Sequence, residues 1–196
     1  MKTKPNSGLS SSVMVWDPLV RFFHWSLVIG FFTSYFATGD WMPAHFWAGY
    51  LVFAWLLIRL VWGFIGTEYA RFRHFIFTPT AVLTYLKDVL FLRAKRYIGH
   101  NPAGGAMIIL LLLCVFTTTL SGMMLYGAEA WLGPLAGLMK NVDDSTIDSL
   151  DIIHEYSANG TVILVFIHVG GVLWESILHR ENLVKSMLTG KKRSEE

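Results

Sequence analysis

Four long apolar segments divide the chain, and each is as long as a helix that crosses a bilayer. They cover residues 19–39, 46–66, 104–127 and 152–178, whereas a membrane-spanning helix needs about 20 apolar residues. The third segment carries no charged residue and the second carries only Arg59. The pattern therefore predicts an all-α membrane protein with a bundle of four transmembrane helices. A packed soluble core is the weaker alternative.

The polar positions between these segments indicate how the helices connect. The short link at residues 40–45 makes the first two helices antiparallel neighbours. In the loop at residues 67–103, Thr78 suits a helix N-cap and Pro79 the first helical position. Apolar residues with helical spacing follow, at Val82, Leu83, Leu86, Val89 and Leu90. This segment predicts an amphipathic helix on the membrane surface, with packing against the bundle as the alternative.

Lysine and arginine gather on one side of the predicted bundle. They precede or open the first segment, crowd the 67–103 loop and follow the fourth segment, whereas Lys140 alone lies in a loop on the other side. By the positive-inside rule, both termini and the 67–103 loop are cytoplasmic. Residues 1–15 are expected to be a disordered tail, 16–190 the membrane domain and 191–196 a charged tail. The basic face is explained by topology and anionic lipid, so nucleic acid is not an expected partner.

Composition supports the membrane assignment and restricts the cofactor chemistry. The 196 residues are 54% hydrophobic and 15% charged, with a net charge of +2, while soluble domains carry nearer to a quarter charged residues. The single cysteine, Cys114, excludes an internal disulfide, a zinc knuckle and the two-cysteine attachment of a c-type haem.

Four of the seven histidines lie within or at the end of a predicted span, where ionisable residues are rare and usually functional. His154 and His168 are 14 residues apart, about four helical turns, so they share a face and are roughly 21 Å apart along the axis. Counting residues back along the first helix from its non-cytoplasmic end places His24 at about the same depth in the membrane as His168. His45 opens the second span, level with His154.

Two imidazoles that face each other across a bundle can hold an iron porphyrin from both axial sides. The levels give two such pairs, His24 with His168 and His45 with His154. Gly49, one turn after His45, would leave room for the haem face, although small residues also serve helix packing. Buried Arg59 needs an anionic partner, either a haem propionate or Glu175. Zinc is disfavoured because its sites need three or four converging ligands.

The segments VWDPLVRFFHW (15–25), HFWAGYLVFAWLLIRLVWGF (45–64) and GHNPAGG (99–105), with the two histidines of the last span, resemble the bacterial cytochrome b561 family. That family includes the cytochrome b subunits of nickel–iron hydrogenases and is similar to those of formate dehydrogenase. The resemblance implies two b-type haems with His24, His45, His154 and His168 as axial ligands, and electron exchange with quinone in a bacterial cytoplasmic membrane. His100 is not a ligand in the family pattern, and we expect it to be solvated or interfacial.

These expectations together describe a di-haem cytochrome that carries electrons between an extracytoplasmic redox partner and the quinone pool. The haem of the His24–His168 pair lies nearer the cytoplasm and is called the inner haem. A quinone site is expected beside it, near His168, Trp174 and the start of the first span. The partner could be a cytochrome c, a hydrogenase or a similar redox protein, and a homodimer stays open. The alternatives are a stand-alone enzyme, such as a superoxide:quinone oxidase, and a non-redox transporter that binds no haem.

Overall fold

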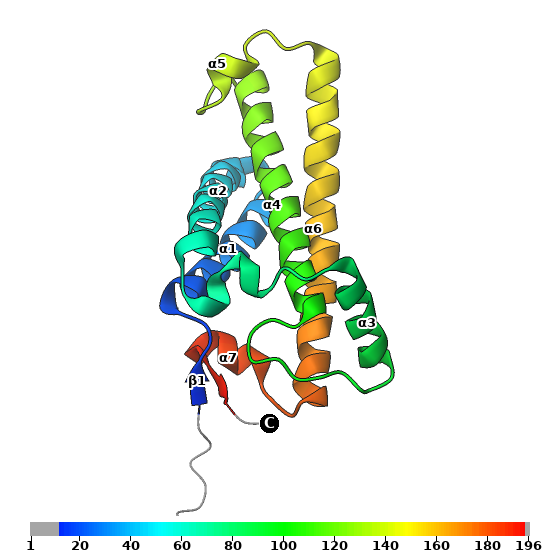
Figure 1. The fold of residues 1–196 in the computed structure, drawn as a ribbon. Helices are drawn as coiled ribbons and strands as arrows, with labels where there is room; N and C mark the ends of the chain where they lie inside the picture. Colours follow the sequence, from blue (N-terminus) through cyan, green and yellow to red (C-terminus); the bar gives the residue numbers. More distant parts are fainter. Residues whose placement is uncertain (1–11, 195–196) are drawn as a thin grey trace, which may run out of the picture.

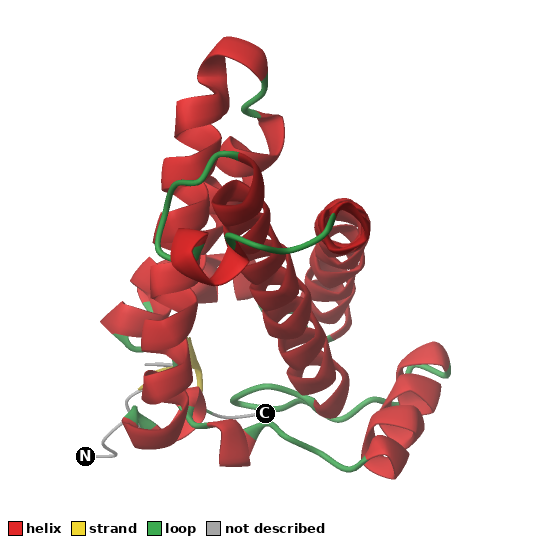
Figure 2. Cartoon of the chain, turned by 90° about the horizontal axis from the view of Figure 1, so that it is seen from above, coloured by secondary structure: helices red, strands yellow, loops and turns green. Residues whose placement is uncertain are grey.

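Four long helices dominate the computed structural model, which describes residues 12–194 (Figure 1). They are α1 (Pro18–Phe36), α2 (Met42–Ile65), α4 (Pro102–Glu129) and α6 (Asp144–Leu178). Each belongs to a segment long and apolar enough to cross a membrane. The prediction of four membrane-length helices is confirmed, and helix is the prevailing structure throughout the bundle (Figure 2).

Side-chain caps mark the start of three of the four long helices, α1, α4 and α6. Asp17 accepts a hydrogen bond from the backbone N–H of Val20 at 2.9 Å and caps α1, and Asn101 caps α4 in the same way. Asp143 accepts from the N–H of Thr146 at 2.7 Å. This last cap starts α6 at residue 144, whereas the apolar pattern placed the span from residue 152. The first two turns of α6 are polar, so hydropathy alone did not include them.

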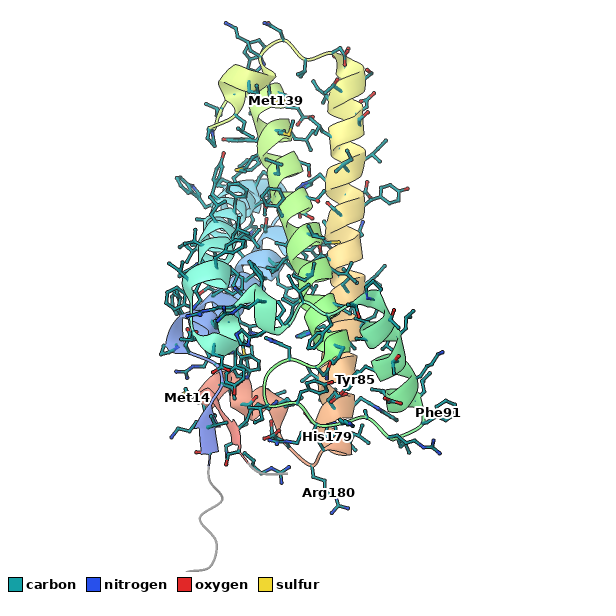
Figure 3. The ribbon with its side chains drawn as sticks, in the orientation of Figure 1. Met14, Tyr85, Phe91, Met139, His179 and Arg180 are labelled. Atoms are coloured by element: carbon teal, nitrogen blue, oxygen red, sulfur yellow. The ribbon has the colours of Figure 1, made fainter. Side chains whose placement is uncertain are left out.

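The long helices pack in two pairs that meet between α2 and α4. Helix α1 runs against α2, and α4 runs against α6. A small core joins Val52 and Leu56 of α2 to Val115 of α4. A Cβ atom on Gly30 would come within 2.8 Å of the Val52 side chain, so glycine at this position allows α1 and α2 to approach closely. Many other large apolar side chains point outward (Figure 3).

Short elements close the two ends of the bundle. The turn η1 (Gly39–Trp41) joins α1 to α2, and α5 (Ala136–Met139) lies between α4 and α6. Met139 packs with Leu125 and Leu150 in a second apolar cluster. At the opposite end, η2 (Glu68–Ala70) and η3 (Phe72–His74) follow α2. The link between α4 and α6 therefore contains a short helix of its own, α5.

The expected loop helix is α3 (Pro79–Leu90), and Thr78 caps it by accepting from the N–H of Ala81. It packs against α4, and the hydroxyl of Tyr85 donates to Glu175 of α6 at 2.9 Å. Leu83, Leu86 and Leu90 remain exposed. The helix therefore lies on the bundle with an apolar side uncovered, and its contact with lipid stays a prediction.

Segments from the two ends of the chain pair with each other in the structure. Strand β1 (Ser12–Met14) pairs antiparallel with β2 (Lys191–Arg193), which follows α7 (Leu183–Thr189). Buried Trp16 donates from its indole to Ser186 at 3.3 Å. The expectation of a disordered tail therefore does not hold for residues 12–15, because backbone pairing orders them, and residues 191–193 of the predicted charged tail form the partner strand. The rest of the predicted N-terminal tail, residues 1–11, and residues 195–196 lie outside the described part of the chain.

Candidate functional site

The structure brings His45 and His154 together across the bundle. Their ring centres are 6.0 Å apart, one ring from the start of α2 and the other from α6. Both rings line a cavity of about 400 Å³ between the four long helices, and Gly49 lines it too. His45 and His154, which were expected at the same depth in the membrane, therefore do lie next to each other in the structure.

Backbone carbonyls orient both rings. His45 Nδ1 lies 2.8 Å from the carbonyl oxygen of Ser34, and His154 Nδ1 lies 2.8 Å from that of Thr118. A carbonyl oxygen only accepts hydrogen bonds, so each Nδ1 carries the donated proton. Nε2 is then the nitrogen whose lone pair can bind a metal, and this second bond is typical of metal-binding histidines. Nothing in the sequence pattern singled out Ser34 or Thr118.

Two glycines shape the space around these rings. A Cβ atom on Gly122 of α4 would lie 2.7 Å from Cε1 of His154, so only glycine lets the ring occupy its position. A Cβ atom on Gly49 would meet only the Ser34 hydroxyl, at 3.9 Å, so this side of α2 is open. A metal–imidazole bond is about 2.0 Å long, and the ring separation therefore leaves room for one metal atom between the two histidines.

Alanine at Gly122 is expected to displace the His154 ring from the Thr118 carbonyl, and so to weaken binding of the haem that the sequence predicts between His45 and His154. In the Gly122→Ala variant we expect this predicted site to hold roughly half as much haem as in the wild type. The reason is that the ring loses the position that its hydrogen bond fixes. Gly160→Ala in α6 is the matched control, since a Cβ atom there meets nothing within 4 Å. Equal haem content in the two variants would contradict a role of Gly122 in placing the ring.

The second predicted pair, His24 of α1 and His168 of α6, lies near the other end of the bundle. The two imidazoles are close enough to interact electrostatically. His24 Nδ1 is buried and has no hydrogen-bond partner within residues 12–194, and the His24 ring sits edge-on to Trp25. Across the same described residues, no three His, Cys, Asp or Glu side chains gather as a metal group.

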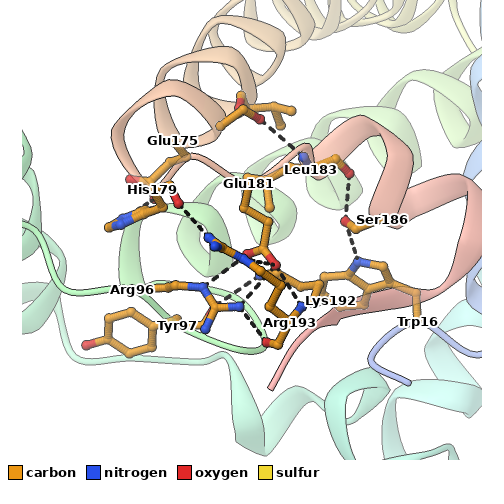
Figure 4. Close-up of polar contacts among 12 residues, drawn as sticks. Trp16, Arg96, Tyr97, Glu175, His179, Glu181, Leu183, Ser186, Lys192 and Arg193 are labelled. Atoms are coloured by element: carbon orange, nitrogen blue, oxygen red, sulfur yellow. Dashed lines mark hydrogen bonds and ion pairs between the residues drawn. The ribbon is translucent and has the colours of Figure 1, made fainter. Parts of the chain in front are cut away.

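Arg59 is buried beside the loop that follows α2. Its Nη2 donates to the carbonyl of Ala70 at 3.0 Å, and its guanidinium lies over the rings of Phe72 and Phe75. Nη1 is buried without a hydrogen-bond partner among the described residues. Glu175, one of the two anionic partners considered for Arg59, instead accepts a hydrogen bond from Tyr85 and pairs with His179 (Figure 4).

His100 is partly buried among aromatic side chains, and its Nδ1 atom is inaccessible to solvent. Its ring lies 4.5 Å from the ring of Trp16 and 4.9 Å from that of Phe75, centre to centre. Burial lowers the pKa of His100 to about 3, and the charges of Arg59 and Lys192 add to this effect. The sequence could not show this packing because Trp16 lies far from His100 along the chain, near the N-terminal end of the fold.

This lowered pKa predicts a pH dependence of stability. Below its unfolded pKa of about 6.5 the unfolded chain protonates His100, while the folded chain does so only near pH 3, so stability falls as the pH drops between these values. From pH 7.5 to pH 5 we expect His100 to account for a loss of about 2 kcal/mol. Melting curves of His100→Gln should show a shallower acid dependence than wild type. An unchanged slope, equal to that of the exposed-residue control His74→Gln, would contradict this prediction.

Comparison with known proteins gives a family for this arrangement. The family model for prokaryotic cytochrome b561 matches residues 15–190. A protein of Rhizobium leguminosarum bv. viciae named as a probable Ni/Fe-hydrogenase B-type cytochrome subunit is 28% identical, over 92% of this chain and 89% of its own length. Proteins of the same name from Azotobacter chroococcum mcd 1 and Rhodobacter capsulatus are 29% and 27% identical. They align over 92% of this chain and over 88% and 81% of their own lengths.

Proposed function

The chain belongs to the prokaryotic cytochrome b561 family, and from this premise we propose that it carries electrons through two b-type haems between an outer redox protein and membrane quinone. Family membership and the four apolar helices make it an integral membrane protein that binds haem b and serves electron transfer. The number of haems, their ligands and the quinone belong to the proposal.

The observation that carries the proposal is the geometry of His45 and His154. Both rings face one cavity, 6.0 Å apart, with Nδ1 held by a backbone carbonyl and Nε2 left as the metal-binding atom. Two opposed imidazoles are the axial set of a low-spin haem, and a bound haem supplies one-electron redox chemistry. The hydrogen bonds to Ser34 and Thr118 hold the two rings in place, so little rearrangement would accompany oxidation or reduction.

The inner pair completes the proposal. His24 and His168 come from α1 and α6, and the helical rise separates His168 from His154 by roughly 21 Å. The buried Nη1 of Arg59 lacks a partner within the described chain, and a haem propionate offers the anion that a buried guanidinium needs. Arg59 and His168 both act electrostatically on His100, and this shared neighbour supports assigning Arg59 to the inner pair.

The proposed direction across the membrane follows from the charges. The positive-inside rule places the inner pair near the cytoplasm, in the cytoplasmic membrane of a bacterium, and the outer pair near the opposite surface. Relatives named as hydrogenase cytochrome subunits support a hydrogenase as the outer partner, and a cytochrome c would occupy the same position. We place the quinone beside the inner haem, near His168, half-exposed Trp174 and the start of α1.

A haem count and a quinone-analogue titration test this proposal. Purified protein should contain about two b-type haems per chain by pyridine haemochrome, with low-spin bands in the reduced-minus-oxidised spectrum. A quinone analogue should shift the signal of the inner haem and leave that of the outer haem unchanged. A folded preparation without haem would contradict the cytochrome proposal and favour the transporter alternative. A titration that shifts the signal of neither haem would contradict the proposed quinone site beside the inner haem.

A further inference from the structure

A basic cleft lies where the α3–α4 loop meets the end of α6. It has a volume of about 460 Å³, and six of its seven lining residues are arginine, lysine or histidine. These residues are Arg93, Lys95, Arg96, His179, Arg180 and Arg193. They come from three separate parts of the chain, the loop after α3, the end of α6 and strand β2. The histidine pairs and Arg59 do not line it.

Interactions behind the cleft hold its walls together. Arg96 pairs with Glu181 at 3.0 Å and donates to the carbonyl of Arg193 at 2.6 Å. Arg193 in turn donates to the carbonyl of His179 at 2.8 Å (Figure 4). The loop, the helix end and the strand are thereby tied to one another. The cleft is therefore a built feature of the fold and not a chance gathering of flexible side chains.

Positive charge in the cleft greatly exceeds negative charge. Five of the lining side chains are arginine or lysine, and Glu181, which pairs with Arg96, offsets one of these charges. Arg93, Lys95, Arg180 and Arg193 are exposed and can reach a ligand. Like charges crowded in one cleft repel each other, so an anion that binds several of them at once is favoured.

The surroundings of the cleft are apolar. Leu90, Phe91 and Leu92, which directly precede the basic loop, are 79%, 71% and 64% exposed. Ile177, one turn before Arg180 in the chain, is 75% exposed. Phe91, His179 and Arg180 all lie at the same end of the molecule (Figure 3). A ligand at this place would meet cations in the cleft and uncovered hydrocarbon beside it.

We propose that this basic cleft binds the phosphodiester headgroup of an anionic phospholipid, with the acyl chains against the exposed apolar side chains next to it. Arginine forks match phosphate oxygens, and basic pockets at the cytoplasmic boundary of membrane proteins suit such headgroups. Free phosphate shares the headgroup chemistry but would leave the apolar rim uncovered. The bound lipid would bridge the α3–α4 loop and α6, two segments that approach the inner histidine pair from the cytoplasmic side.

Lipid binding to the purified full-length holoprotein tests the inference. Delipidated protein in neutral detergent is titrated with phosphatidylglycerol, with phosphatidylcholine and with inorganic phosphate, and bound lipid is counted by native mass spectrometry. The test variant is Arg93→Gln/Lys95→Gln/Arg180→Gln. The matched control, Arg73→Gln/Lys185→Gln/Lys191→Gln, removes three exposed cations outside the cleft.

We expect saturable phosphatidylglycerol binding that the test variant weakens about tenfold or more and the control leaves within about twofold. Haem content serves as the folding check for both variants. Equal binding of phosphatidylcholine, or equal loss in both variants, would overturn the inference. Competition by millimolar phosphate that removes the lipid completely would also overturn it, because the cleft would then be a site for a free anion.

Discussion

Replacing His154 with alanine is expected to remove the proposed outer haem and to leave the proposed inner one. Haem content should fall from about two to about one per chain, because His45 alone cannot supply both axial ligands. Electron transfer from an outer donor to quinone should be lost, since the remaining haem lies roughly 21 Å further along α6. The measurements are a pyridine haemochrome count and reduction of a quinone analogue by an artificial outer electron donor.

The reciprocal variant and a matched control make this prediction specific. His168→Ala should remove the inner haem and keep the outer one, so the two variants should lose different spectral components. His74→Ala replaces an exposed loop histidine and should retain both haems. If the His154 variant kept two haems with unchanged low-spin bands, the outer ligand assignment would be wrong.

Replacing Glu181 with glutamine is expected to destabilise the end of the bundle where the two termini meet. The Glu181 carboxylate accepts from Arg96 and from the backbone N–H of Arg193, and Lys192 approaches it at 3.9 Å. The side chains of Glu181, Arg96 and Lys192 are only 7%, 10% and 5% exposed. Breaking one partner of a buried charge pair costs about 3–5 kcal/mol, because the other charge stays desolvated.

Thermal unfolding followed by circular dichroism would measure this loss. Glu68→Gln serves as the control, since Glu68 is exposed in the loop after α2, and surface substitutions usually change stability by about 0.5 kcal/mol or less. Limited proteolysis should cut the Glu181 variant first near β1 and β2, which this cluster helps to hold. A melting temperature equal to that of the control would show that the cluster contributes little.

The sequence by itself determined the elements and their levels. Four apolar runs specified four membrane-length helices, because a bilayer demands that length and an internally bonded backbone. Thr78 and Pro79 marked the start of α3 for local reasons that hold in any fold. The regular rise of a helix was also enough to set His45 level with His154 before any contact was known. All of these features depend on neighbours in sequence or on helical geometry.

Only the tertiary structure decided what surrounds those histidines. The carbonyls of Ser34 and Thr118 and the space at Gly122 come from other helices, so no local pattern pointed to them. The same reason explains the errors. Residues 12–14 form a strand because a segment near the far end of the chain pairs with them, and His100 is only partly exposed because Trp16, distant in the sequence, packs against its ring. Hydropathy and spacing describe one helix at a time, whereas a ligand's orientation and a side chain's burial depend on segments that only folding brings together.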